Sequence, residues 1–234
     1  MTKIEHRWRE HYVDTLRGWI GAKEGDAIHK RIIDTYNSLK PLPCGYRMTY
    51  KDPWCAATVS AAAIEAGLTD IIFRECSCIR MIELFKKNGR WMEDDGYIPQ
   101  PGDVIFYDWG DSGKGDNTGA PDHVGVVEKV TDGLITVIEG NYHDAVGRRY
   151  IRVDNRYIRG YGLPAYASMS DSPPPATVTP PSDVIPPPVS VATPQTNGGR
   201  VRAMDNANLA AFLTNPPPLA VGQSWAEWLE ADAL

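Results

Sequence analysis

Apolar residues in the first third of the chain recur at the three- and four-residue spacing of an amphipathic helix. Between residues 4 and 19 the spacing is carried mainly by Ile, Trp, Tyr and Leu. A second such stretch ends before Pro41, which cannot continue a helix. An alanine-rich stretch ended by Gly67 and a mixed stretch ended by Gly89 follow. The predicted helices are 4–19, 27–39, 55–66 and 74–88.

After residue 100 the pattern changes to short runs of β-branched and aromatic residues separated by turn residues. Pro101-Gly102-Asp103 and Asp132-Gly133 are typical turn sequences. The predicted strands are 104–107, 123–128, 134–139, 149–153 and 158–162. Helices followed by an antiparallel meander predict an α+β fold, with the N-terminal helices packed on the sheet.

Proline divides the chain into unlike parts. Twelve of the 19 prolines lie after residue 167, and nine of these lie between residues 173 and 194. Proline blocks helices and central strands, so we expect an extended linker at 168–199; a docking peptide for a proline-reading domain is the less favoured alternative. The predicted organisation is a folded domain at 1–167, this linker, and a short helical segment at 200–234.

Composition and charge exclude several classes of protein. Of the 234 residues, 42% are hydrophobic and 23% are charged, which is typical of a globular protein. The net charge is −6, concentrated after residue 167, and there is no long basic block, so nucleic acid is not an expected partner. Apolar runs are far shorter than the roughly 20 residues that cross a bilayer, and the polar N-terminus does not resemble a Sec signal. We expect no membrane insertion.

Cys55 is the first candidate for chemistry. Pro53 interrupts the preceding chain, and the small residues that follow place Cys55 at a predicted helix N-terminus. Free backbone N–H groups and the helix dipole favour an anion there, so the reactive thiolate would be stabilised. A lone cysteine in an alanine-rich helix is more often a small buried hydrophobe, and this alternative stays open.

His123 begins one predicted strand, and Glu139 ends the next, with Asn141 shortly after it. In an antiparallel pair, the start of one strand lies beside the end of its partner, so these side chains can meet at one edge of the sheet. A nucleophilic cysteine needs a histidine base, and that imidazole needs an acceptor that orients it. A structural histidine and an ordinary turn are the competing interpretations.

Four sequence blocks, taken in their order along the chain, together resemble the motifs of one protein family. They are Trp54-Cys55-Ala56-Ala57-Thr58-Val59-Ser60, Pro101-Gly102-Asp103-Val104-Ile105-Phe106, Asp122-His123-Val124-Gly125-Val126-Val127 and Ile138-Glu139-Gly140-Asn141. The chain thereby resembles the CHAP family, the cysteine, histidine-dependent amidohydrolases/peptidases, over residues 45–165. The resemblance implies a papain-like scaffold related to the NlpC-type peptidases.

The resemblance also implies roles for particular residues. Cys55 corresponds to the nucleophile, His123 to the general base, Glu139 to the residue that orients the imidazole, and Asn141 to a polar residue that accompanies it. Such enzymes cleave amide bonds in bacterial peptidoglycan, as an endopeptidase or as an N-acetylmuramoyl-L-alanine amidase. A phage or prophage endolysin has a similar layout, with a catalytic domain, a proline-rich linker and a small C-terminal segment.

Two other functions remain as alternatives. One is a non-catalytic module on the same fold that binds cell wall or forms part of a virion, and the other is a cysteine hydrolase of different amides. For the endolysin, we expect synthesis in the host cytoplasm and action on the wall after release or from a virion. The acidic C-terminal segment would act by self-association or by its tryptophans rather than by charge.

Aromatic residues near the candidate site are predicted to bind substrate. Tyr50 is a candidate oxyanion donor, and Trp54 and Trp109 are candidate walls of a cleft, although core packing is the usual role of a tryptophan. His143 is expected to face solvent.

No metal or other cofactor is expected. Residues 44–52 hold a single aspartate where some CHAP lysins have a calcium loop, and the Asp-rich loop 108–117 is more typical of a cleft wall than of a cation site. Three further cysteines are expected to be free thiols: Cys44, Cys76 and Cys78.

Overall fold

The computed structural model describes residues 1–94, 96–114 and 116–171, which lie in one compact unit, Met1–Pro180. Its helices are α1 (Lys3–Arg17), α2 (Ala27–Ser38), α3 (Cys55–Glu65) and α4 (Cys78–Lys87). Its strands are β1 (Trp91–Met92), β2 (Val104–Tyr107), β3 (His123–Thr131), β4 (Leu134–Glu139), β5 (Gly147–Arg152) and β6 (Ile158–Gly162). The predicted α+β class and the order of elements are confirmed.

Local sequence explains where most helices begin. Thr2 and Glu5 form a capping box at the start of α1, and the side chains of Asp26 and Ser77 cap α2 and α4. Helix α4 starts at Cys78 rather than near the predicted residue 74, because Ser77 is its cap. Helix α3 differs, since Trp54 precedes it and supplies no side-chain cap. Its first backbone N–H groups therefore have no capping side chain.

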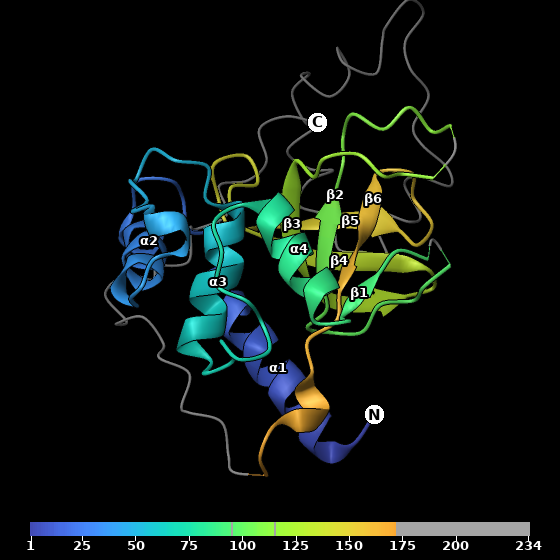
Figure 1. Ribbon diagram of the computed structural model, residues 1–234, viewed down its shortest axis with the longest axis horizontal. Coiled ribbons are helices and arrows are strands. Elements are labelled where there is room, and N and C mark those ends of the chain that lie inside the picture. The colour runs from blue at the N-terminus through green and yellow to red at the C-terminus, as the bar shows by residue number, and fades with distance from the viewer. Residues whose placement is uncertain (95, 115, 172–234) are drawn as a thin grey trace, which may run out of the picture. The chain divides into compact units, whose positions relative to one another are not determined.

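The six strands form one antiparallel sheet in the order β1-β6-β2-β3-β4-β5. Strand β1 was not predicted from the sequence, since only two residues pair with β6. Figure 1 shows the helices on one side of the sheet, with α2 separated from the strands by α3. This arrangement confirms the prediction that the N-terminal helices pack on an antiparallel sheet.

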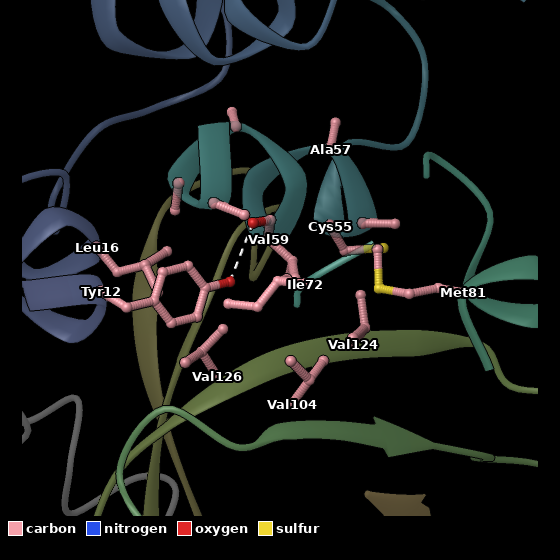
Figure 2. Close-up of a cluster of buried hydrophobic side chains, with 14 of the residues drawn as sticks. Tyr12, Leu16, Cys55, Ala57, Val59, Ile72, Met81, Val104, Val124 and Val126 are labelled. Carbon is pink, nitrogen blue, oxygen red and sulfur yellow. Dashed lines mark hydrogen bonds between the residues drawn. The ribbon is translucent and has the colours of Figure 1, made fainter. Parts of the chain in front are cut away.

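The main core lies between α1, α3 and the sheet, where alternate strand residues such as Val104, Val124 and Val126 face the helices. Figure 2 shows this cluster, in which the Tyr12 hydroxyl donates to the Val59 carbonyl at 3.0 Å and so joins α1 to α3. A second cluster covers the opposite face of the sheet. The two-residue period of a strand produces both faces.

The end of the described chain returns to α1. The 3-10 turn Tyr166–Ser168 is followed by Ser170, whose carbonyl accepts from the Trp8 indole at 3.0 Å, and by Asp171, which pairs with Arg7. The folded part therefore extends past the predicted boundary at residue 167. The rest of the predicted linker and the segment 200–234 lie outside the described residues. Within the described chain, every helix is too short or too polar to cross a bilayer.

Candidate active site

Cys55 is the first residue of α3, as predicted, and 7% of it is exposed. The Ala56 N–H, one of the uncapped groups at this helix end, helps to lower the pKa of the Cys55 thiol. Figure 2 places Cys55 at the start of α3, with Val124 and Met81 nearby. The nucleophile predicted from the sequence thus lies at the border between the core and the end of the sheet.

His123 and Glu139 meet across the β3–β4 hairpin. The His123 Nε2 atom lies 2.9 Å from the Glu139 Oε2 atom, and Glu139 is fully buried. Gly125 makes this contact feasible, because a Cβ atom there would lie 2.6 Å from the Glu139 Cγ atom. The side chain of Glu139 therefore lies over a position that only glycine leaves open.

Gly140 brings this end of β4 onto α3. A Cβ atom at Gly140 would overlap the Thr58 hydroxyl, which lies one helical turn after Cys55. The same hydroxyl donates to the Trp54 carbonyl at 2.9 Å. The close approach of the strand end to the start of α3 places the His123–Glu139 pair beside Cys55.

The electrostatics favour an ion pair between Cys55 and His123. Hydrogen bonds with Cys78 and with His123 hold the pKa of the Cys55 thiol well below its usual range, against the effect of burial. Burial alone favours neutral imidazole, but hydrogen bonds with Cys55 and Glu139 outweigh it and raise the pKa of His123 to about 9. The arrangement therefore favours a thiolate at Cys55 and an imidazolium at His123.

Arg149 is a component of this site that the sequence did not reveal. It lies on β5, and its Nε atom donates to both Glu139 carboxylate oxygens, at 2.8 and 3.0 Å. Its guanidinium also lies over the rings of Tyr107, Trp109 and Tyr142, 5.5, 4.6 and 4.5 Å from their centroids. The alternation of side chains along β5 could have indicated which face of the sheet Arg149 occupies. It could not have indicated that Glu139 is its partner.

Two of the predicted substrate contacts do not agree with the structure. Trp54 is completely buried and packs on the His29 ring, with centroids 4.8 Å apart, so it belongs to the core and presents no surface to substrate. Tyr50 is exposed, but its hydroxyl bonds to both carboxylate oxygens of Asp34 at 3.0 Å. Its hydroxyl hydrogen is thus directed to Asp34 and not to an acyl oxygen.

Other predicted residues are placed as follows. Trp109 is 37% exposed and stacks on Tyr107 at 4.7 Å, so it remains a candidate substrate contact. Asn141 follows Gly140 in the left-handed conformation, φ 55°, and is half-buried. Its catalytic role remains a prediction. His143 is exposed, as expected.

The aspartates of the loop after β2 bond to backbone groups. Asp108 accepts from the Gly110 N–H at 2.9 Å, Asp111 from the Gly113 N–H at 2.7 Å, and Asp122 from the Trp109 N–H at 2.7 Å. These contacts shape turns. Among the residues that the structure describes, no three His, Cys, Asp or Glu side chains are grouped in a way that could hold a metal ion.

All four cysteines are free thiols. Cys44 is exposed and Cys76 is partly buried. The sequence did not show that the Cys78 sulfur lies 3.9 Å from the Cys55 sulfur. The two residues come from the first turns of different helices.

The fold and the site define an α+β domain in which a cysteine at the start of a helix lies beside a histidine and a glutamate at the ends of two neighbouring strands. Residues 45–141 match the family model of the CHAP domain, which confirms over this segment the resemblance deduced from the sequence. The matched segment begins before α3 and ends at Asn141, and thus contains Cys55, His123 and Glu139.

Solved structures and curated proteins were also compared with the chain. Two similar structures are "The crystal structure of Ly7917" and "The crystal structure of Ly7917 with the hydrolyzing product of MDP", each 15% identical, with TM-scores of 0.38 and 0.39. Each match covers 67% of this chain and 62% of the Ly7917 chain, which is less than two thirds of that protein's length. A comparison with curated proteins gives no match.

Proposed function

We propose that this protein is a peptidoglycan hydrolase that cleaves an amide bond through Cys55, His123 and Glu139. The observation that carries the proposal is the thiol of Cys55 at an uncapped helix N-terminus, bonded to a histidine whose other contact is a buried carboxylate 2.9 Å away. Nucleophile, proton carrier and orienting group are thus present together. The choice of peptidoglycan is supported by the match of residues 45–141 to the CHAP domain.

The proposed mechanism is acyl transfer. The Cys55 thiolate attacks the scissile carbonyl carbon, and a tetrahedral intermediate forms with the negative charge on oxygen. The backbone N–H of Cys55, which has no partner within the helix, stabilises that oxyanion. The His123 imidazolium gives its proton to the leaving amine, and the C–N bond breaks to leave a thioester.

Hydrolysis of the thioester completes the cycle. His123, now neutral, takes a proton from water, which attacks the thioester carbonyl and releases the carboxylic acid and the Cys55 thiolate. Glu139 keeps the imidazole oriented throughout, because its carboxylate is held between His123 and Arg149. Asn141, which follows β4 two residues after Glu139, would accompany this pair as a further polar group of the site.

A comparison of cysteine variants on purified Gram-positive cell walls tests this function. We expect Cys55→Ala to abolish the loss of turbidity while its circular dichroism stays that of the wild type. Cys44→Ala is the matched control, since Cys44 is exposed and lies outside α3, and it should clear walls at the wild-type rate. Clearing by Cys55→Ala would refute the assignment of the nucleophile.

Mass spectrometry of the released fragments distinguishes the remaining possibilities. New N-terminal amines within the peptide would indicate an endopeptidase, and free lactyl groups would indicate an amidase. Binding of walls without release of fragments would instead favour the non-catalytic wall-binding or virion module. Release from a host cell as a phage or prophage endolysin is part of the same proposal, and its test is lysis from within when the chain is expressed with a holin.

A further inference from the structure

Two thiols lie side by side in the candidate active site. Cys78 is the first residue of α4, and its sulfur is 3.9 Å from the sulfur of Cys55, the first residue of α3. Both residues are buried, with 9% and 7% of their surfaces exposed. The proposed mechanism uses only Cys55, so the second thiol needs its own explanation.

The direction of this S···S hydrogen bond follows from the charge of Cys55. A thiolate has no hydrogen and can only accept, so Cys78 must be the donor whenever Cys55 is ready to attack. Ser77 fixes the position of the donor, because its side chain caps α4 directly before Cys78.

We propose that Cys78 is a positioning residue of the active site, which donates its S–H to the Cys55 thiolate and holds that sulfur in place for attack. This proposal rests on the assignment of Cys55 as the nucleophile. A neutral thiol is suited to this role, because it donates a hydrogen bond to a buried anion and brings no second charge beside it.

The groups around the pair support this assignment of donor and acceptor. The Ala56 N–H of α3 and His123 of β3 bond to Cys55, and both favour its thiolate form. Hydrogen bonding to Cys55, burial and the charge of Asp122 raise the pKa of Cys78 well above its usual range. Cys78 therefore keeps its proton across the pH range in which Cys55 is ionised.

The test measures how the alkylation of Cys55 by iodoacetamide depends on pH. Reduced protein is labelled at a series of pH values, and mass spectrometry of the peptide that contains Cys55 reports its rate. We expect Cys78→Ala to raise the pH midpoint of Cys55 alkylation by about one unit, because the thiolate loses a charge-assisted hydrogen bond. Cys78→Ser keeps a donor and should restore a midpoint close to that of the wild type.

Two further variants separate this role from a merely structural one. Cys76→Ala removes a thiol from the same segment that has no bond to Cys55, and should leave the midpoint unchanged. Cys78→Val fills the space without a donor, and should reproduce the shift if Cys78→Ala does not fold. An unchanged midpoint in folded Cys78→Ala or Cys78→Val, or equal shifts in Cys78→Ala and Cys78→Ser, would overturn the proposal.

The alkylation assay needs no cell wall, so its result is independent of the proposed substrate. A protein that fails to cleave peptidoglycan but shows the shifted midpoint would contradict the proposed function and support the role of Cys78. If the protein cleaves walls but Cys78→Ala leaves the midpoint of Cys55 alkylation unshifted, the proposed function would be supported and the role of Cys78 contradicted.

Discussion

At the scale of single residues, the site is a row of alternating charges. The Cys55 thiolate faces the His123 imidazolium, the Glu139 carboxylate follows, and the Arg149 guanidinium completes the row. Each charge has an opposite neighbour, which offsets the cost of placing charged groups in a largely buried site. The fully buried Glu139 is the central element of this row, because it contacts both cations.

The charges predict a bell-shaped dependence of kcat/KM on pH. The proposed mechanism needs Cys55 deprotonated and His123 protonated, so kcat/KM should rise as the thiolate forms and fall as pH increases through about 9, the pKa of His123. Initial rates of wall clearing from pH 5 to 10 measure this profile. The pKa assignment would be contradicted by full activity retained at pH 10.

Arg149 is expected to act through Glu139 rather than on substrate. Arg149→Met removes both hydrogen bonds to the carboxylate, so Glu139 can turn away from the imidazole. We expect kcat to fall by about ten- to a hundred-fold with little change in KM. The kinetics of fragment release measure both parameters.

Arg152→Met is the control for Arg149→Met, since Arg152 lies on β5 opposite Leu134, at the other end of β4 from Glu139. It should leave kcat unchanged. Equal losses in both variants would mean that the strand needs arginine for stability and that Glu139 is not the reason.

At the scale of elements, the site depends on how closely the end of β4 approaches the start of α3. Gly140 lies against Thr58 of α3, and Gly125 of β3 lies beneath the side chain of Glu139. Neither glycine has a positive φ, so the absence of a Cβ atom matters here for space and not for backbone conformation. Gly140 thus sets the distance between the end of β4 and the helix that holds Cys55, and Gly125 makes room for the side chain of Glu139 beside β3.

Gly140→Ala should separate these two elements. The added methyl group overlaps Thr58, so β4 must move away from α3. We expect the free energy of unfolding to fall by about 1–3 kcal/mol, and activity to fall more than this loss of stability explains. Urea denaturation and wall clearing measure the two effects.

Gly18→Ala serves as the comparison for Gly140→Ala. Gly18 follows α1 with a helical φ of −63°, and its nearest neighbour to an added Cβ atom lies at 3.4 Å. This variant should keep both stability and activity. Wild-type activity in Gly140→Ala would show that the approach of β4 to α3 does not position the site.

At the scale of the whole molecule, the two ends of the described chain lie against each other. Helix α1 packs against α3, and the residues after β6 return to α1, where Trp8 and Arg7 bond to Ser170 and Asp171. The partly buried Met169 packs against the same core. The first helix and the last described residues therefore stabilise each other.

Two truncations test where the folded unit ends. A chain of residues 1–171 keeps all of these contacts and should unfold at the wild-type temperature. A chain of residues 1–167 loses Met169 and the bond from Trp8, so its free energy of unfolding should be lower by about 1–2 kcal/mol. Calorimetry measures both, and equal unfolding temperatures would place the end of the unit at residue 167.

Two predicted substrate contacts, Trp54 and Tyr50, point away from the candidate site. Trp54 and Tyr50 were placed beside substrate because they lie near Cys55 in the sequence. Neighbours along the chain often point in different directions at the start of a helix, and here Trp54 points into the core and Tyr50 to Asp34. Distance along the sequence is a poor guide to side-chain direction at such a boundary.

The sequence by itself determined the elements and three members of the site. Helical and alternating spacing predicted the α+β order, Pro53 and the small residues after it predicted that Cys55 begins a helix, and a hairpin placed His123 beside Glu139. These predictions succeed because each depends on local conformation or on pairing of adjacent strands.

Only the tertiary structure decided which further side chains join the site. Cys78 comes from a different helix, and Arg149 is brought to Glu139 by the pairing of β5 with β4. Nothing in the local sequence of either residue specifies its partner, because the contact depends on how whole elements pack. The sequence therefore determines where Cys55, His123 and Glu139 lie in their elements, and the packing of α3, α4 and the sheet determines their surroundings.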